Sequence, residues 1–205
     1  MRAGCFLAVI AISQVAGQPR SVYFKEPYGP EHQLVSPNGA YALFGIQSAI
    51  NADNALWLED RKTHQRKMVF PVTVQTLTVA WAPDSSAFIA NDRAASDIEN
   101  AYIFDVKTLD RLDLTNLITA NAEPRFRKEQ NDHSYFHATR WLDARHVEVA
   151  LYGHTGGVSK GTHVQSGDCF NLRYRVSRDG AVQKLAQRVA SLDSKDCDAI
   201  ESDQR

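Results

Sequence analysis

A short motif matches the signature of a catalytic nucleophile. Gly157–Gly161 reads Gly-Val-Ser-Lys-Gly, which is the spacing of a nucleophile elbow, a motif that works where a strand turns sharply into a helix. The loop-like residues 162–168 predict no such helix, and the last histidine, His163, follows Ser159 by only four residues. The chain order serine, acid, histidine therefore cannot be assembled. We expect a loop between two strands and keep a hydrolase or metal-dependent enzyme using residues 153–168 as the alternative.

Histidines are the second candidate for chemistry, because four of the seven cluster in or beside loops: His133, His137, His154 and His163. The helical His-Glu-x-x-His motif of zinc enzymes does not occur in the sequence. His133 and His137 flank a strand-like run, and four residues of strand span about 13 Å. One ion about 2 Å from each nitrogen cannot bridge that distance. The sequence predicts neither a metal nor another cofactor.

The two cysteines after the N-terminal region are best explained by a disulfide. Residues 1–17 combine Arg2, the apolar run Phe6–Ile12 and small residues ending at Gly17, the pattern of a secretory signal peptide cleaved after Gly17. Export predicts a periplasmic or secreted protein, and Cys5 leaves with the signal. Cys169 and Cys197 would then close a loop of about 30 residues, worth about 3.5 kcal/mol in the chain-entropy model. A metal pair is the weaker reading, since no Cys-x-x-Cys accompanies them.

Composition restricts the class of partner. The chain has 205 residues, 43% hydrophobic and 23% charged, and its formal net charge is -1. These proportions are those of a globular protein. The strong basic excess that drives binding to a phosphate backbone is lacking, so no nucleic acid is expected. No later segment approaches the roughly 20 apolar residues of a membrane helix, so no membrane span is expected either.

Period-two alternation dominates the remaining sequence. Apolar and polar residues alternate over Leu77–Trp81, Val147–Leu151 and Leu172–Val176, as half-buried strands require. Leu114–Ala122 alone suggests a short helix, which opens at Thr115-Asn116 and which Pro124 would end. The pattern predicts an all-β fold.

The strands belong to a repeated unit. The first copy contains Ser36–Gly39, Tyr41–Phe44, Ala55–Asp60 and Lys62-Thr63. The second contains Ala82–Ser85, Ala87–Ala90, Ala101–Asp105 and Lys107-Thr108. The copies are offset by about 46 residues, within the range typical of propeller blades. A looser third copy begins at Trp141 and ends at the turn Arg178–Gly180. Trp57, Trp81 and Trp141 recur at corresponding or nearby positions, which indicates packing between repeats.

At these residues the sequence resembles the blades of TolB-like and WD40-like β-propellers. The resemblance implies one domain over residues 18–205, a β-propeller-like array of about three antiparallel four-stranded blades, with repeats at about 34–72, 77–114 and 139–186. Closed rings normally have four to eight blades, so we expect an open array capped by residues 18–33 and 115–138, with a homo-oligomer as the alternative. His64 and Leu109 stand where the pattern has glycine, so these turns need another backbone solution.

Loops joining the second and third strands of successive repeats should share one edge. These loops are Gln47–Asn54, Asn91–Asn100 and Gly153–Asp168. The candidate binding residues on them are Asp53, Asp92, Arg93, Asp97, Glu99 and His154. The sequence thus favours an exported, non-enzymatic binding module of the bacterial envelope whose ligand is a protein or a small polar molecule.

Overall fold

The computed structural model describes residues 18–22, 33–47, 54–72, 76–95, 98–127, 133–155, 167–192 and 194–202. The expected signal peptide, Asp53, Asp97, His163 and the Gly157–Gly161 motif lie outside the described residues.

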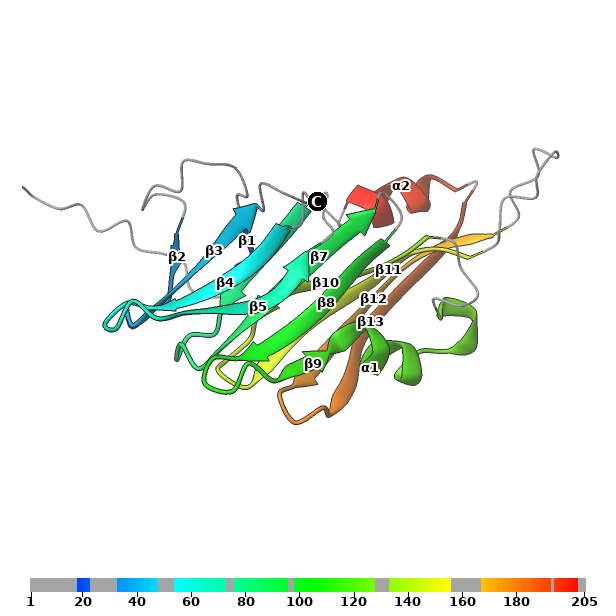
Figure 1. Cartoon of the computed structure of the whole chain (residues 1–205). Coiled ribbons are helices and arrows are strands. Elements are labelled where there is room, and N and C mark those ends of the chain that lie inside the picture. The colour runs from blue at the N-terminus through cyan, green and yellow to red at the C-terminus, as the bar shows by residue number, and fades with distance from the viewer. Residues whose placement is uncertain are drawn as a thin grey trace, which may run out of the picture.

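The first repeat forms a separate four-stranded antiparallel sheet, called blade 1 (Figure 1). Its strands are β2 (Leu34–Val35), β3 (Tyr41–Gln47), β4 (Asn54–Asp60) and β5 (Arg66–Val72). Each strand pairs with the next along the chain, as in a propeller blade.

The second repeat forms blade 2 in the same antiparallel order. Its strands are β6 (Thr76–Trp81), β7 (Ala87–Ala95), β8 (Ile98–Asp105) and β9 (Arg111–Asp113). The short β1 (Arg20–Ser21) adds to this sheet by pairing with β6. The expected capping segment 18–33 therefore contributes an additional strand to blade 2.

The third repeat forms blade 3 from longer strands than its sequence signal indicated. The strands are β10 (His133–Trp141), β11 (His146–His154), β12 (Asp168–Ser177) and β13 (Val182–Ser191). Residues 133–138, expected to belong to a cap, are part of β10, which also pairs with β8 in parallel at its first residues. Within the described residues no strand pairing joins blade 3 to blade 1, so the all-β propeller-like array is open.

Two apolar cores lie between the three blades. Leu43 and Phe70 of blade 1 pack with Val79 and Phe104 of blade 2. A second core joins blade 2 to blade 3 and is covered by helix α1 (Leu114–Asn121) and the 3-10 turn η2 (Pro124–Phe126). The helix ends before Pro124 as predicted. It begins at Leu114, where the expected range also begins, and the Asp113 carboxylate caps it by accepting a hydrogen bond from the Asn116 amide.

Two tryptophans tie successive blades together. The indole Nε1 of Trp81, at the end of β6, donates to the Leu34 carbonyl of β2 over 2.8 Å. Trp141, at the end of β10, donates in the same way to the Ala80 carbonyl of β6 over 3.0 Å. Trp57 differs, because it lies within β4 and its buried Nε1 has no hydrogen-bond partner among the described residues. The structural role expected for the tryptophans thus holds between blades for Trp81 and Trp141.

The two turns that lack glycine keep the backbone conformation of a glycine turn, which costs conformational energy in a residue with a side chain. Asp60 accepts hydrogen bonds from the amides of Lys62 and Thr63, and Asp105 does the same for Lys107 and Thr108. The residues at the glycine positions, His64 and Leu109, adopt φ values of 58° and 61°. This left-handed region costs a non-glycine residue about 1–2 kcal/mol, so the aspartate-bound turns hold strained residues in place.

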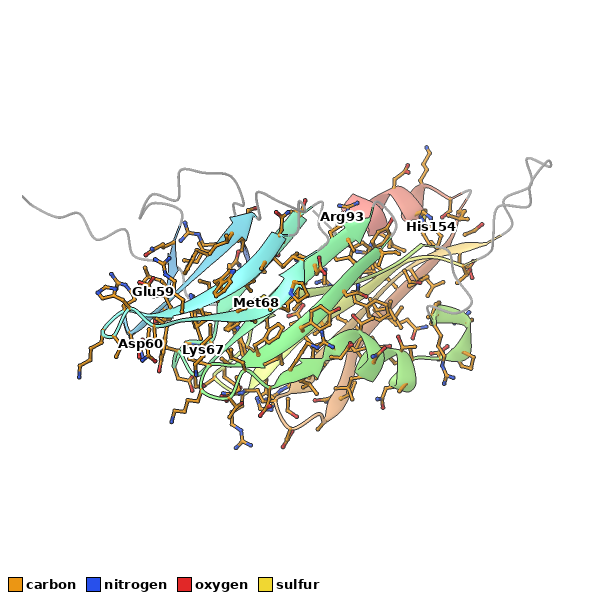
Figure 2. All side chains as sticks on the ribbon, in the orientation of Figure 1. Glu59, Asp60, Lys67, Met68, Arg93 and His154 are labelled. Carbon is orange, nitrogen blue, oxygen red and sulfur yellow. A yellow bond between two sulfur atoms is a disulfide. The ribbon has the colours of Figure 1, made fainter. Side chains whose placement is uncertain are left out.

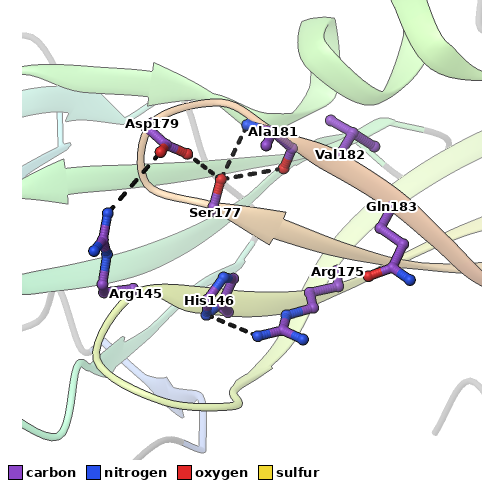
Figure 3. A pocket seen from close by; sticks show the side chains of 8 residues that line it. All are labelled: Arg145, His146, Arg175, Ser177, Asp179, Ala181, Val182 and Gln183. Atoms are coloured by element: carbon purple, nitrogen blue, oxygen red, sulfur yellow. Dashed lines mark hydrogen bonds and ion pairs between the residues drawn. The ribbon is translucent and has the colours of Figure 1, made fainter.

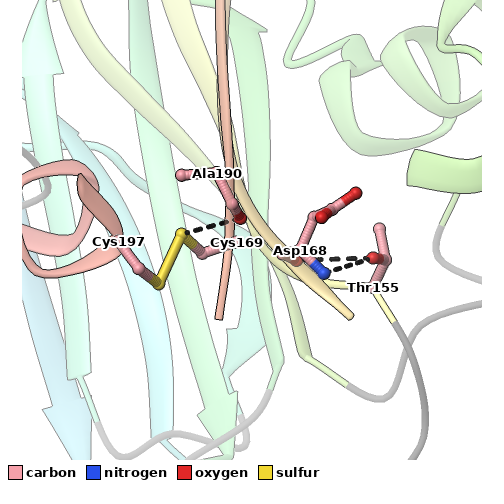
Figure 4. The surroundings of a disulfide bond; sticks show 5 residues. All are labelled: Thr155, Asp168, Cys169, Ala190 and Cys197. Carbon is pink, nitrogen blue, oxygen red and sulfur yellow. Dashed lines mark hydrogen bonds between the residues drawn. A yellow bond between two sulfur atoms is a disulfide. The ribbon is translucent and has the colours of Figure 1, made fainter. Parts of the chain in front are cut away.

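The predicted disulfide between Cys169 and Cys197 is present (Figure 4). It links β12 to helix α2 (Lys195–Ser202), an element that the polar tail sequence did not indicate. Both cysteines are buried together with Ile200, so the bridge and a small apolar cluster fasten α2 to blade 3.

We expect Trp81→Phe to lower the free energy of unfolding by about 1–3 kcal/mol, because the buried Leu34 carbonyl loses its donor. Trp57→Phe is the matched control and should change it by less than about 1 kcal/mol, since its indole nitrogen donates to nothing. Denaturant titration measures both. Equal losses in the two variants would show that ring size, and not the hydrogen bond, matters.

The double variant Cys169→Ser, Cys197→Ser should lose about 2–4 kcal/mol of stability, because the unfolded chain regains the freedom of the closed loop. Thermal melting with and without reductant measures the effect. Reductant should lower the melting temperature of the wild type and leave that of the double variant unchanged. Free thiols in the purified, unreduced protein would contradict the bridge.

Candidate functional site

The polar segment expected to form a loop at Asn91–Asn100 is mostly strand. β7 continues through Ala95 and β8 begins at Ile98. The expectation was wrong because Asn91, although polar, is buried and bonds to another blade: its side chain donates to the Ala138 carbonyl and accepts from the Ala138 amide. Most of the segment is therefore paired strand and not a loop.

Glu99 is the centre of a hydrogen-bonded cluster between blades 2 and 3. One carboxylate oxygen lies 2.7 Å from Nδ1 of His137 on β10. The other accepts a hydrogen bond of 3.0 Å from the Tyr152 hydroxyl on β11. Burial, and then the charge of Glu99, raise the pKa of Tyr152 well above its ordinary value. Both carboxylate oxygens are thus engaged, and Tyr152 stays a neutral donor.

An aromatic and cationic surface adjoins this cluster. Tyr135 lies beside Glu99 in the parallel register of β8 and β10. Its ring stacks on that of Tyr152 with 5.1 Å between the ring centres. The guanidinium of Arg93 lies 5.8 Å from the centre of the Tyr135 ring, within the range of a cation–π interaction. We call Arg93, Glu99, Tyr135, His137 and Tyr152 the Glu99 cluster.

Asp92 lies apart from this hydrogen-bond network. Its residue is 8% exposed, and its Oδ1 atom is buried without a hydrogen-bond partner. Burial, followed by the nearby charge of Glu99, raises the pKa of this carboxyl. Burying a carboxylate oxygen that accepts no hydrogen bond costs free energy, which makes Asp92 a destabilising residue at neutral pH.

The predicted binding residues fall into separate groups. Arg93 and Glu99 belong to the cluster, whereas Asp92 lies beside it and His154 ends β11 two residues beyond Tyr152. Arg93 and His154 lie at the same end of the sheets, away from Glu59 and Lys67 (Figure 2). Sequence reasoning missed Tyr135, Tyr152 and the pairing role of His137. The alternation of Tyr135 and His137 on one strand was an available signal, but their carboxylate partner lies in another repeat.

The cluster has the chemistry of a recognition surface. Both carboxylate oxygens of Glu99 already contact His137 and Tyr152, so Glu99 is poorly placed to take up a proton from a substrate. Arg93 is exposed, and the side chain of His137 is 30% exposed, so both can hydrogen-bond a ligand. Among the described residues, no three His, Cys, Asp or Glu side chains gather as metal ligands would.

Comparison with known proteins found similarity to solved structures alone. No protein-family model matches the chain, and no curated protein matches it. Solved structures similar to it include the β-propeller domain of the Trilobed protease from Pyrococcus furiosus, at 16% identity and a TM-score of 0.44. The match covers 75% of this chain and 42% of that one. The chain is built of β-propeller-like repeats. This assignment rests on the strand registers of the three blades.

Two further structures show the same kind of similarity. TolB from Acinetobacter baumannii is 14% identical, with a TM-score of 0.35, and the match covers 79% of this chain and 43% of that one. Pyrococcus horikoshii acylaminoacyl peptidase is 16% identical, with a TM-score of 0.40, covering 75% of this chain and 24% of the other. This chain thus spans less than half the length of each of these proteins.

Among the described helices, neither has the length and apolarity to cross a bilayer.

Asp92→Asn should stabilise the protein by about 1 kcal/mol at pH 7, because the amide removes a buried charge. In the wild type, the buried charge lowers the free energy of unfolding only when the carboxyl is ionised. The penalty is absent below the ordinary pKa of 3.8 and grows as the pH rises through it toward the raised pKa of the folded state. The gain should therefore disappear in denaturant titrations at pH 3. Exposed Asp110→Asn is the control, and an equal gain there would contradict the argument.

Proposed function

We propose that this chain is an exported, non-enzymatic binding module of the bacterial envelope, located in the periplasm or secreted. It binds a protein or a small polar ligand at the Glu99 cluster. The observation that supports this proposal is the convergence of polar side chains from β7 and β8 of blade 2 and from β10 and β11 of blade 3, which Glu99 joins.

The cluster is well suited to recognition because strands hold its side chains. Glu99 fixes His137 and Tyr152 through hydrogen bonds, and stacking fixes Tyr135. Side chains locked in this way lose little conformational entropy on binding. Tyrosine and arginine are also the side chains that most often dominate binding energy at protein interfaces.

Export is supported by two independent features. The N-terminal sequence has the basic start, apolar run and small-residue end of a signal peptide. The Cys169–Cys197 disulfide suits an oxidising compartment such as the periplasm. The intact mass of protein recovered from its native host tests this part of the proposal: we expect the mass of a chain beginning at Gln18, found outside the cytoplasm.

Binding is tested by placing a photoreactive amino acid at Arg93 and, as the control, at Lys67 at the far end of blade 1 (Figure 2). Crosslinking in living cells should give a defined product from position 93 and none from position 67. His137→Ala, in a protein that carries the probe at position 93, should reduce that product about tenfold, the equivalent of losing one good hydrogen bond. Equal products from both positions would contradict a specific site.

The enzyme alternative is tested on the same preparation. Turnover in a broad hydrolase screen, abolished by Ser159→Ala and unaffected by His137→Ala, would replace the binding proposal by a hydrolase that uses residues 153–168. Stoichiometric metal in the purified protein would do the same for a metal-dependent enzyme.

A further inference from the structure

His137 is held by a group that can only accept hydrogen bonds. Its Nδ1 atom lies 2.7 Å from one carboxylate oxygen of Glu99, and the other oxygen accepts from the Tyr152 hydroxyl. A neutral imidazole carries one proton on one of its two nitrogens, and an ionised carboxylate has none to give. An imidazole is also a stronger base than a carboxylate. The proton of neutral His137 therefore lies on Nδ1, which donates it to Glu99.

The second ring nitrogen of His137, Nε2, is consequently an acceptor at the surface. Among the described residues, no group hydrogen-bonds Nε2. The atom is accessible to solvent, in contrast to the buried Nε1 of Trp57. In the tautomer that Glu99 selects, Nε2 has a lone pair and no proton. Neutral His137 thus offers a ligand one hydrogen-bond acceptor in a fixed position.

His146, at the opposite end of blade 3, resembles His137 but lacks this defined acceptor (Figure 3). Its Nδ1 atom lies 2.8 Å from the Asp143 carboxylate, and the guanidinium of Arg175 lies 3.1 Å from the same nitrogen. An acceptor and a cationic donor therefore compete for one ring nitrogen, so the carboxylate alone does not select the tautomer. This contrast makes His146 a matched control for His137.

We propose that the ligand of the Glu99 cluster donates an N–H or O–H group to Nε2 of His137, and that a second proton on this ring releases the ligand. This inference rests on the binding function proposed above and names the chemistry and the regulation of its contact. The second proton comes from solvent and binds Nε2. A doubly protonated imidazole is a donor at both nitrogens, so the donor of the ligand then faces another donor. Glu99 acts as a positioning residue, because it orients the ring without touching the ligand.

Binding should therefore be present at neutral pH and lost in acid. Histidine is the side chain that ordinarily changes its charge between about pH 5 and 8. Directly opposite His137 on β11 is the apolar Ala150. The charged and titratable groups that adjoin the ring from neighbouring strands are Asp92 and Arg93 of β7, Glu99 of β8, Glu148 and Tyr152 of β11, and Arg173 of β12.

Nitrogen NMR of the histidine rings in the purified protein measures the tautomer without any ligand. At about pH 7.5, His137 should carry its proton on Nδ1 and show an unprotonated Nε2. His64 is 79% exposed and lies 3.5 Å from Glu59, so it provides the reference signal of a ring that no close carboxylate orients. A proton on Nε2 of neutral His137 would overturn the proposal.

The crosslink from position 93 measures the contact with the ligand. The product formed at about pH 7.5 should fall about tenfold at about pH 5, the equivalent of losing one good hydrogen bond. His137→Gln supplies an amide oxygen that accepts at both pH values, so this variant should keep the product at both. An equal or larger wild-type product at about pH 5 would overturn the proposal, as would loss of the product from His137→Gln at about pH 7.5.

Matched variants separate the ring of His137 from its neighbours. His146→Ala removes the control histidine, and Asp92→Asn removes a carboxyl whose pKa is raised by burial and then by the charge of Glu99. Both variants should keep the pH dependence of the wild type. Its loss in either variant, or its persistence in His137→Gln, would overturn the assignment to His137. Absence of any wild-type product at both pH values would contradict the binding function itself, whereas the NMR measurement would still decide the tautomer.

Discussion

The fold depends on the stacking of each blade on the next, which the indole hydrogen bonds of Trp81 and Trp141 hold in register. Each bond joins the end of one innermost strand to the backbone of the preceding one, so it fixes both the distance and the shift between blades. The apolar faces then pack in two continuous cores. Asn91 adds a third tie through both backbone groups of Ala138. A buried polar group with fixed partners specifies position in a way that apolar contact alone does not.

Among the described residues, no further blade covers the outer face at either end of the open array. Blade 3 carries charge there: Glu148 pairs with Arg140 at 2.9 Å and with Arg173 at 3.5 Å. A polar outer face is what terminal repeats need in order to remain soluble. Blade 1 shields its aromatic surface differently, because the guanidinium of Arg66 lies 5.0 Å over the Phe44 ring while pairing with Glu59. Charged side chains thus end the stack at both sides.

The blades could be predicted from the sequence because their turns depend on contacts between nearby residues. The site could not, because it depends on polar contacts between residues far apart in the chain. Asp105 and the amides it binds lie within three residues, so the repeat and its turns were predictable. The left-handed backbone of Leu109 was not, because a turn without glycine was expected to need another backbone solution. The helix at Leu114–Asn121 was predictable for the same reason. Glu99 and Tyr152 are 53 positions apart, and only the stacking of blades makes them neighbours. Polar residues such as Asn91 in strands suggest loops unless their distant partners are known.

The carboxylates on the outer face of blade 3 and on the adjoining β8 find their donors in two different ways. Glu99 is held by His137 and Tyr152, and Glu148 by Arg140 and Arg173, so along the middle of the face each carboxylate meets its donors within the sheet. Toward the turns, Asp143 is instead satisfied by backbone amides and His146. Backbone donors carry no net charge, so Asp143 keeps its negative charge, which lies 3.8 Å from the Nη2 atom of Arg175. Backbone amides and His146 therefore fix the position of Asp143, while its charge offsets that of Arg175 at the turn end of the blade.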